Sequence, residues 1–196
     1  MHQMLGRHAL QLNMWIVLVA LGCYQLYLQW HLRGGEGFKE GFIKNLQVLT
    51  GIPALVFLGV YLIDPTEIGY VFVHIPHLLR LVGLVLFNGA GLLIVWSHVT
   101  LGRFWSGDLE TRADHRVIDT GPYHYVRHPL YASYLYMTLG LFLMTGNWLV
   151  GGSMLLYFTA VAARCGKEEE MLLSRLGAPY AHYMRRTNRF IFGKVR

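Results

Sequence analysis

The chain has 196 residues, of which 54% are hydrophobic and only 14% are charged, against about 25% charged residues in an average soluble domain. A soluble domain of this size needs a charged exterior, so we expect lipid to cover much of its surface. The net charge of +6 is concentrated in residues 164–196, which hold eight Lys and Arg against three Glu. This local excess is typical of a tail beside a membrane, and we expect no nucleic-acid partner.

Five apolar stretches are candidate membrane spans, since a span takes about 17–25 residues. In chain order they are residues 9–30, 46–63, about 78–98, 129–145 and 148–163. The last two are separated only by Gly146-Asn147 and are predicted to form a helical hairpin. Residues 65–79 are predicted to be an interfacial segment or a loop. The sequence therefore predicts an all-α, polytopic membrane protein with about five transmembrane helices.

Basic residues set the expected orientation. The connections 31–45 and 100–128 carry three and four Lys or Arg, whereas residues 64–77 carry none. With five spans, both basic connections and the C-terminal tail lie on the cytoplasmic side, and the N-terminus lies outside. We expect one membrane domain, with three spans in residues 1–99 and a cofactor-binding part in residues 100–196.

Residues 121–134 read GPYHYVRHPLYASY and place polar side chains at the start of the fourth apolar stretch. Pro129 suits the first position of a helix. The free N–H groups and positive dipole end of that helix would attract an anion beside Arg127 and His128, and Arg127 can offer a planar fork to it. An interfacial anchor is the alternative reading of the same residues.

The tail adds a second polar group on the same predicted side of the membrane. Arg164 and Glu168 lie four residues apart, on one face of a helix, while Glu169 and Glu170 point elsewhere. A simple surface ion pair would contribute under about 1 kcal/mol. An arginine and a carboxylate that face an anion-binding helix end make, instead, a site for a zwitterion.

The run HRVIDTGPYHYVRHPLY, followed about 35 residues later by the pattern EExxLLxxxGxxYxxYxxxxxRF, resembles the isoprenylcysteine carboxyl methyltransferase family. The resemblance covers roughly residues 100–192, and the wider superfamily includes bacterial phospholipid N-methyltransferases. It implies an enzyme that binds S-adenosylmethionine at the cytoplasmic face and methylates a lipid-like or prenylated acceptor, with S-adenosylhomocysteine as the product. The preferred acceptor is a carboxylate. Where the family usually shows Gly after the motif tyrosine, this chain has Ala132.

The resemblance also implies the residues of the site. Arg164 matches the arginine credited with the acceptor and is the predicted catalytic residue. Glu168 matches the acidic residue that holds the cofactor. The other expected cofactor-binding positions are His115, Arg116, Val117, Ile118, Gly121, Tyr123, His124, Arg127, His128, Pro129, Leu130, Tyr131 and Glu169.

Several alternatives remain open from the sequence. A carboxylate acceptor is already ionised at pH 7, whereas an amine needs a base, for which His124 or Glu169 are candidates. A membrane reductase that uses NADPH shares the Arg-His-Pro-x-Tyr stretch, although Ala132 and Ser133 depart from its usual pattern. A scaffold whose basic tail binds anionic lipid is a third possibility. No metal site is expected, and neither the acceptor nor the oligomeric state is determined.

Overall fold

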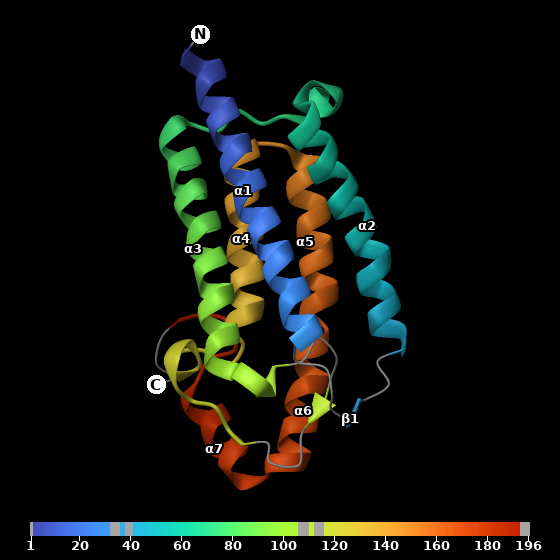
Figure 1. Ribbon diagram of the computed structural model, residues 1–196, viewed down its shortest axis with the longest axis vertical. Helices are drawn as coiled ribbons and strands as arrows, with labels where there is room; N and C mark the ends of the chain where they lie inside the picture. Colours follow the sequence, from blue (N-terminus) through green and yellow to red (C-terminus); the bar gives the residue numbers. More distant parts are fainter. Residues whose placement is uncertain (1, 32–35, 38–40, 106–109, 112–115, 193–196) are drawn as a thin grey trace.

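The computed structural model describes residues 2–31, 36–37, 41–105, 110–111 and 116–192. Within these residues the fold is all-α apart from two short strands, β1 (Glu36–Gly37) and β2 (Glu110–Thr111), which pair antiparallel. Five long helices run side by side as a bundle (Figure 1). They are α1 (His2–His31), α2 (Gly41–Ile63), α3 (His77–Leu101), α4 (Pro129–Thr145) and α5 (Trp148–Ala162).

Shorter elements lie at the two ends of the bundle (Figure 1). The 3-10 helix η1 (Pro65–Val71) lies at the end that holds the N-terminus, next to the α4–α5 turn. The opposite end holds η2 (Gly102–Phe104), η3 (Gly121–His124), α6 (Arg164–Leu176) and α7 (Ala178–Arg186). We call residues 116–128 together with residues 164–192 the cap.

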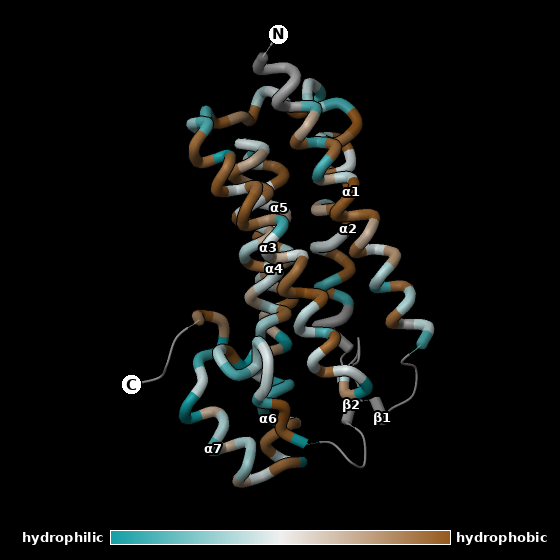
Figure 2. Tube along the Cα trace, turned by 60° about the vertical axis from the view of Figure 1, so that its left-hand side comes forward, coloured by the Kyte–Doolittle hydropathy of each residue, from teal (hydrophilic) through white to brown (hydrophobic). Residues whose placement is uncertain are grey.

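The bundle has the length and composition of a membrane domain. Four helical stretches of the described chain are long and apolar enough to cross a membrane: His8–Leu28, Asn45–Ile63, His77–Phe104 and Trp148–Leu176. Many large apolar side chains on the bundle are exposed, and Figure 2 shows hydrophobic residues along its length. Because lipid is the solvent that such a surface requires, the chain is an integral, multi-pass membrane protein. The helix α4, with 17 residues, lies at the lower limit of a span.

Close packing of α3 against α4 places the start of α4. A Cβ added to Gly140 would lie 2.8 Å from the carbonyl oxygen of Gly83 and from the amide nitrogen of Phe87. Small residues allow two membrane helices to approach this closely. Phe87 is fully buried and packs in a core with Met14 and Leu141. Residues that precede α4 are thereby held at a fixed place at the end of the bundle.

The turn between α4 and α5 is fixed by Asn147. Its side-chain oxygen accepts hydrogen bonds from the amides of Leu149 (2.9 Å) and Val150 (3.1 Å), which caps the start of α5. Its side-chain nitrogen donates to the carbonyl of Ile68 in η1 (2.9 Å). Gly146 precedes it with a φ of +64°, a conformation that favours glycine. The two helices therefore run antiparallel, as the sequence predicts.

The predicted boundaries agree closely with the observed helices. The helix α4 has the predicted limits, and α5 ends one residue earlier than predicted. However, α1 begins at residue 2 rather than 9, and α2 at residue 41 rather than 46. The prediction followed apolar composition, whereas the backbone hydrogen-bond ladder continues through polar residues. Within 65–79, the structure has η1, a non-helical stretch and then the start of α3 at His77.

Candidate active site

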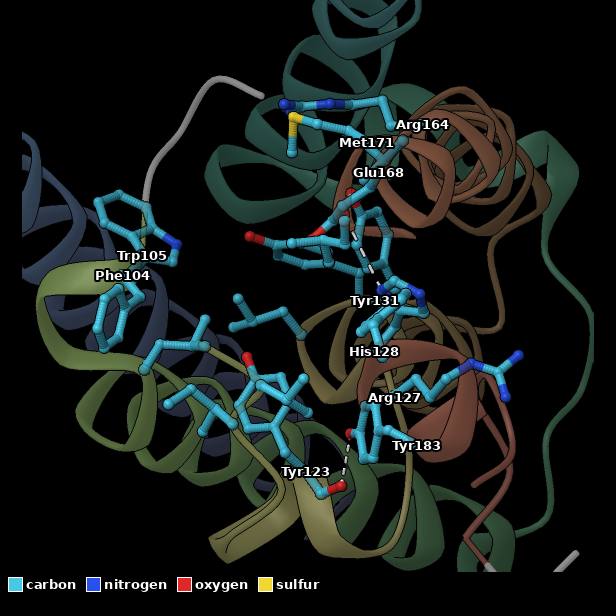
Figure 3. A pocket seen from close by; sticks show the side chains of 18 of the residues that line it. Phe104, Trp105, Tyr123, Arg127, His128, Tyr131, Arg164, Glu168, Met171 and Tyr183 are labelled. Carbon is cyan, nitrogen blue, oxygen red and sulfur yellow. Dashed lines mark hydrogen bonds and ion pairs between the residues drawn. The ribbon is translucent and has the colours of Figure 1, made fainter. Parts of the chain in front are cut away.

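A cavity of ≈ 350 Å³ lies where the bundle meets the cap. Its walls come from α1 to α7 and from residues 116–131, so segments far apart in the sequence build it together. Figure 3 shows Trp105 and Phe104 on one side and Tyr131, His128 and Glu168 on the other. A small-molecule site typically encloses roughly 300–1,000 Å³, so this cavity can hold a ligand of that class.

One wall of the cavity carries a hydrogen-bonded carboxylate. The hydroxyl of Tyr131 donates to Oε2 of Glu168 over 2.8 Å. Nδ1 of His128 lies 3.9 Å from the same oxygen, and the Glu168 side chain is 29% exposed. Arg164 lines the same cavity one helical turn before Glu168. The predicted placement of Arg164 and Glu168 on one face is therefore confirmed.

The neighbouring carboxylate, Glu169, has a different environment. It is 4% exposed, and three basic side chains converge on it. Nε of Arg127 lies 3.0 Å from Oε1, and Nε2 of His128 lies 3.1 Å from the same atom. Nε of Arg189 donates to both carboxylate oxygens, over 3.1 and 3.0 Å. These hydrogen bonds to Glu169 raise the pKa of the Arg189 guanidinium.

Arg127 uses its guanidinium inside the cap. Besides Glu169, it donates through one terminal nitrogen to the carbonyls of Met184 (2.7 Å) and Thr187. Figure 3 shows the guanidinium directed away from the cavity, although other atoms of the side chain line it. The expectation was a planar fork offered to a bound anion. In the structure, this fork joins α6 and α7 to the start of α4.

Backbone hydrogen bonds close the cap over the same corner. The amides of Arg127 and His128 donate to the carbonyls of Asn188 (2.8 Å) and Arg189 (3.0 Å). The hydroxyl of the buried Tyr183 donates to the carbonyl of Tyr123 over 2.6 Å, and burial raises the pKa of this hydroxyl. The expected meeting of residues 100–128 with the tail is thus confirmed for residues 116–128.

The end of the cavity that faces the bundle is lined by polar groups from membrane helices. Gln25 comes from α1, Gln47 from α2, and Tyr157 from α5, with Tyr134 of α4 beside them. The Nε2 atom of Gln47 is buried and has no hydrogen-bond partner within the described chain. Polar side chains at membrane depth are costly and usually face a functional interior. The sequence pattern identified neither Gln25 nor Gln47 as a site residue.

Most of the predicted site residues line this cavity. The ten that do so are Arg116, Val117, Ile118, Tyr123, Arg127, His128, Leu130, Tyr131, Arg164 and Glu168. His115 lies outside the described residues.

Four predicted positions lie outside the cavity lining. Gly121 has a φ of +56° and sits against Thr100, while Pro129 is the first residue of α4. His124 is exposed and contacts the ring of Tyr125 edge-on. Glu169 contacts the ring of His128, which lines the cavity, but does not line the cavity itself. Their positions fit a role in shaping the loop and the cap.

The structure also adds residues that sequence reasoning did not select. Arg189 was present in the tail motif, but its partner Glu169 could not be identified from helical spacing, since the two are twenty residues apart in different segments.

Among the described residues, no group of three or more His, Cys, Asp or Glu is arranged to hold a metal ion.

Comparison with known proteins matches part of this chain to one protein family. A sequence model of the isoprenylcysteine carboxyl methyltransferase (ICMT) family matches residues 81–174. Over these residues, about half of the chain, the sequence is similar to the ICMT family. The matched range contains α4, α5 and most of α6, and with them Arg127, His128, Arg164 and the Glu168–Glu169 pair.

A solved ICMT-family structure has a similar fold. The structure of a eukaryotic intramembrane Ras methyltransferase, ICMT, superimposes with a TM-score of 0.56 at 23% identity. The superposition covers 74% of this chain and 51% of that protein. At this identity, the likeness supports the fold alone.

Two curated bacterial relatives are similar over about half of this chain. The cobalt-zinc-cadmium resistance protein CzcN of Cupriavidus metallidurans is 33% identical over 95 residues, which are 48% of this chain and 44% of CzcN. The nickel-cobalt-cadmium resistance protein NccN of Alcaligenes xylosoxydans xylosoxydans is 33% identical over 92 residues, 46% of this chain and 43% of NccN. The aligned part therefore spans less than half of each relative's length.

Proposed function

We propose that this chain is an integral membrane methyltransferase that uses S-adenosylmethionine to methylate the carboxylate of a lipid-like or prenylated acceptor. The observation that carries the proposal is the cavity at the junction of bundle and cap, which Arg164 and Glu168 line together. The match of residues 81–174 to the ICMT family model supports the class of reaction. The expected partners are membrane lipids and the acceptor, with no nucleic acid.

The cavity has the donor set and size that the cofactor requires. Glu168 presents a partly exposed carboxylate to the cavity and is suited to hold an ammonium group. The aromatic faces of Tyr123, Tyr131 and Trp105 line the same space and are suited to a sulfonium cation. Bound S-adenosylmethionine would supply an electrophilic methyl group to this site.

The chain's own residues would orient the acceptor. Arg164 is the first residue of α6, where its guanidinium can hold a carboxylate by a bidentate contact. Tyr134, Tyr157 and Gln47 offer further hydrogen-bonding groups on the side of the bundle. Such alignment supplies most of the catalysis in a displacement that needs no proton transfer.

The positions of the two candidate bases favour a carboxylate over an amine. His124 is exposed and does not line the cavity, and Glu169 is enclosed by three basic side chains. An amine acceptor would need one of them at the reacting atom. A phospholipid or other small-lipid N-methyltransferase is therefore the second candidate.

The proposal includes an orientation in the membrane. With α4 as a fifth span, the N-terminus lies outside, and the cap lies in the cytoplasm with the active site. The end of the bundle that carries the cap also holds the basic residues 185, 186 and 189, as the positive-inside rule requires of a cytoplasmic face.

Isothermal titration of the detergent-purified protein tests the cofactor. S-Adenosylhomocysteine and NADPH are titrated separately into the wild type, Glu168→Gln and Glu170→Gln. Glu170 is the matched control, since it lies on the same helix but is exposed. We expect saturable binding of S-adenosylhomocysteine alone, about tenfold or more weaker in Glu168→Gln and unchanged in Glu170→Gln, since a hydrogen bond to a charged group contributes roughly 1.5–3 kcal/mol.

Other outcomes of the titration would overturn the proposal. Binding of NADPH alone would point to a reductase, and binding of neither ligand to a membrane scaffold. If the cofactor binds, transfer of a labelled methyl group to N-acetyl-S-farnesylcysteine and to phosphatidylethanolamine separates the two acceptor classes. Label found only on the amine would replace the carboxylate proposal.

A further inference from the structure

A second cavity lies at the end of the bundle opposite the cap. It has a volume of ≈ 230 Å³, far more than the ~30 Å³ that one water molecule occupies in the liquid. Its walls come from the end of α2, from η1, from the segment between η1 and α3, from the first turns of α3 and from the end of α4. Its lining residues are Tyr61, Pro65, Phe72, Val73, His74, Arg80 and Thr145. None of them lines the first cavity.

The cavity wall contains an arginine side chain, Arg80, with one nitrogen that lacks a hydrogen-bond acceptor. Nε of Arg80 is buried and has no hydrogen-bond partner in the described chain. No ion pair joins Arg80 to either acidic residue of this end, Asp64 or Glu67, within the described part of the chain. Asp64 is instead engaged by the amide (2.9 Å) and hydroxyl (2.6 Å) of Thr66. An arginine nitrogen buried without an acceptor is costly, so the arrangement favours an anion supplied from outside.

Two neighbouring features add positive potential to the same cavity. The 25-residue helix α3 starts at His77, and no side chain accepts a hydrogen bond from its first N–H groups. These N–H groups and the positive dipole end of α3 therefore face this end of the bundle. Arg80 lies in the first turns of α3, and a helical side chain leans toward the N-terminus of its helix. His74 completes the wall with a second nitrogen-bearing side chain. Such a combination suits an anion with several oxygens.

The surroundings of the cavity are those of a membrane boundary. Ile63, Tyr70 and Leu78 are 81%, 81% and 72% exposed next to its walls. They flank the ends of two stretches that are apolar enough to cross a membrane, Asn45–Ile63 and His77–Phe104. A phosphate on a lipid headgroup would reach this depth with its acyl chains along the exposed apolar helices.

We propose that this second cavity binds a phosphate group through Arg80, at the membrane surface opposite the cap. The proposal is independent of the methyltransferase site, because no described residue lines both cavities. The phosphate can come from a phospholipid headgroup or from a free phosphate in solution, and the chemistry of recognition is the same for both. Arg80 donates to the phosphate oxygens, and the α3 N-terminus stabilises their charge.

Thermal unfolding in a neutral maltoside detergent tests this site. The protein is titrated with dioleoylphosphatidylglycerol, with dioleoylglycerol as the matched lipid without phosphate, and with inorganic phosphate against sodium chloride at equal ionic strength. The variants are Arg80→Gln, Arg80→Lys and, as the control, Arg175→Gln, whose side chain is exposed on α6. Circular dichroism and gel filtration establish that each variant is folded.

We expect phosphatidylglycerol to raise the unfolding temperature saturably and dioleoylglycerol to have no such effect. Arg80→Gln should weaken the apparent affinity about tenfold, since it removes hydrogen bonds to a charged group. Arg80→Lys keeps the charge but not the planar guanidinium, so its apparent affinity should lie between those of the wild type and Arg80→Gln. Arg175→Gln should have the affinity of the wild type. An Arg80-dependent shift with inorganic phosphate as well would support a free phosphate as the source, and a shift with the lipid alone would support a headgroup.

Two results would overturn the proposal. One is the absence of any phosphate-dependent shift in the wild type, in both the lipid and the salt series. The other is an equal shift in the wild type and in both Arg80 variants, which would place the phosphate elsewhere on the protein. If Arg80→Gln does not fold, the comparison of Arg80→Lys with the wild type still decides between these outcomes.

Discussion

The bundle and the cap are held together in different ways. In the bundle, α3 and α4 approach until a Cβ on Gly83 or Gly140 would meet backbone atoms of the other helix within 3 Å. In the cap, a buried carboxylate gathers three basic side chains, and hydrogen bonds join segments that are forty to sixty residues apart. Figure 2 shows the same division, with hydrophobic residues along the bundle and hydrophilic ones concentrated in the cap.

This difference follows from the surroundings of each part. In lipid, burial of apolar surface gains little between helices, so close packing of small residues and internal hydrogen bonds must hold them. At the membrane boundary, water competes for polar groups, and a buried ionic cluster gives the cap a single arrangement. The cavity lies between the two parts, and each supplies one side of it. Three changes break one kind of contact at a time, and they are given from the largest expected effect to the smallest.

Replacing Glu169 by Gln should be the most disruptive change to the cap. It leaves the largely buried Arg127 without its anionic partner, and the buried His128 with only the more distant Glu168, 3.9 Å away. Removing one member of a buried ionic group costs about 3–5 kcal/mol, and we expect the lower end because Arg189 is half-exposed. The free energy of unfolding is measured by titration with sodium dodecyl sulfate. The exposed Glu170→Gln on the same helix is the control, and equal stability of the two variants would contradict the cap account.

Replacing Gly140 by Ala tests the packing of the bundle. The added methyl would lie 2.8 Å from backbone atoms of α3, which cannot move aside as a flexible side chain can. Overpacking of this kind costs roughly 1–3 kcal/mol, measured in the same titration. Gly152→Ala, on α5, places its methyl where nothing lies within 4 Å. If both substitutions leave the stability unchanged, close helix approach does not hold the bundle.

Replacing Tyr183 by Phe removes one short hydrogen bond from the cap, and a long one of 3.5 Å to the carbonyl of Val126, with little change of shape. The short bond joins the Tyr183 hydroxyl to the carbonyl of Tyr123, which lines the cavity. A hydrogen bond of this type contributes about 0.5–1.5 kcal/mol, so the unfolding free energy should fall by about 1 kcal/mol. The control is Tyr180→Phe, at an equally buried ring whose hydroxyl makes no hydrogen bond within the described chain. If Tyr180→Phe loses more unfolding free energy than Tyr183→Phe, then ring packing, rather than this hydrogen bond, stabilises this part of the cap.

Local signals in the sequence predict much of the fold. Pro129 marks the first residue of α4 because its fixed φ suits that position, and Gly146-Asn147 marks the turn to α5. Apolar composition predicts the long helices, since a membrane requires continuous hydrogen-bonded segments of a certain length. The spacing of four residues also places Arg164 and Glu168 on one face before any tertiary contact is known.

The use of each polar side chain depends on contacts that are distant in sequence. Glu168 and Glu169 are adjacent and chemically equal, yet Glu168 faces the cavity while Glu169 is enclosed by Arg127, His128 and Arg189. Helical spacing predicts the direction of each glutamate side chain, but not the groups that surround it in the folded protein. Likewise, Gln47 reaches the cavity only because α2 packs beside α5 in the bundle.

The sequence by itself determined the membrane class, the limits of α4, the tight turn that follows it and the meeting of the Arg127–His128 corner with the tail. The first three depend on hydropathy, backbone preferences and short spacings, which act within a few residues of the chain, and the last depends on how the basic residues are distributed among the connections. The tertiary structure decided which carboxylate lines the cavity, where the Arg127 guanidinium points, and that Arg80 lines a second cavity at the far end. These depend on which surfaces meet when the helices pack, and no local pattern contains that information.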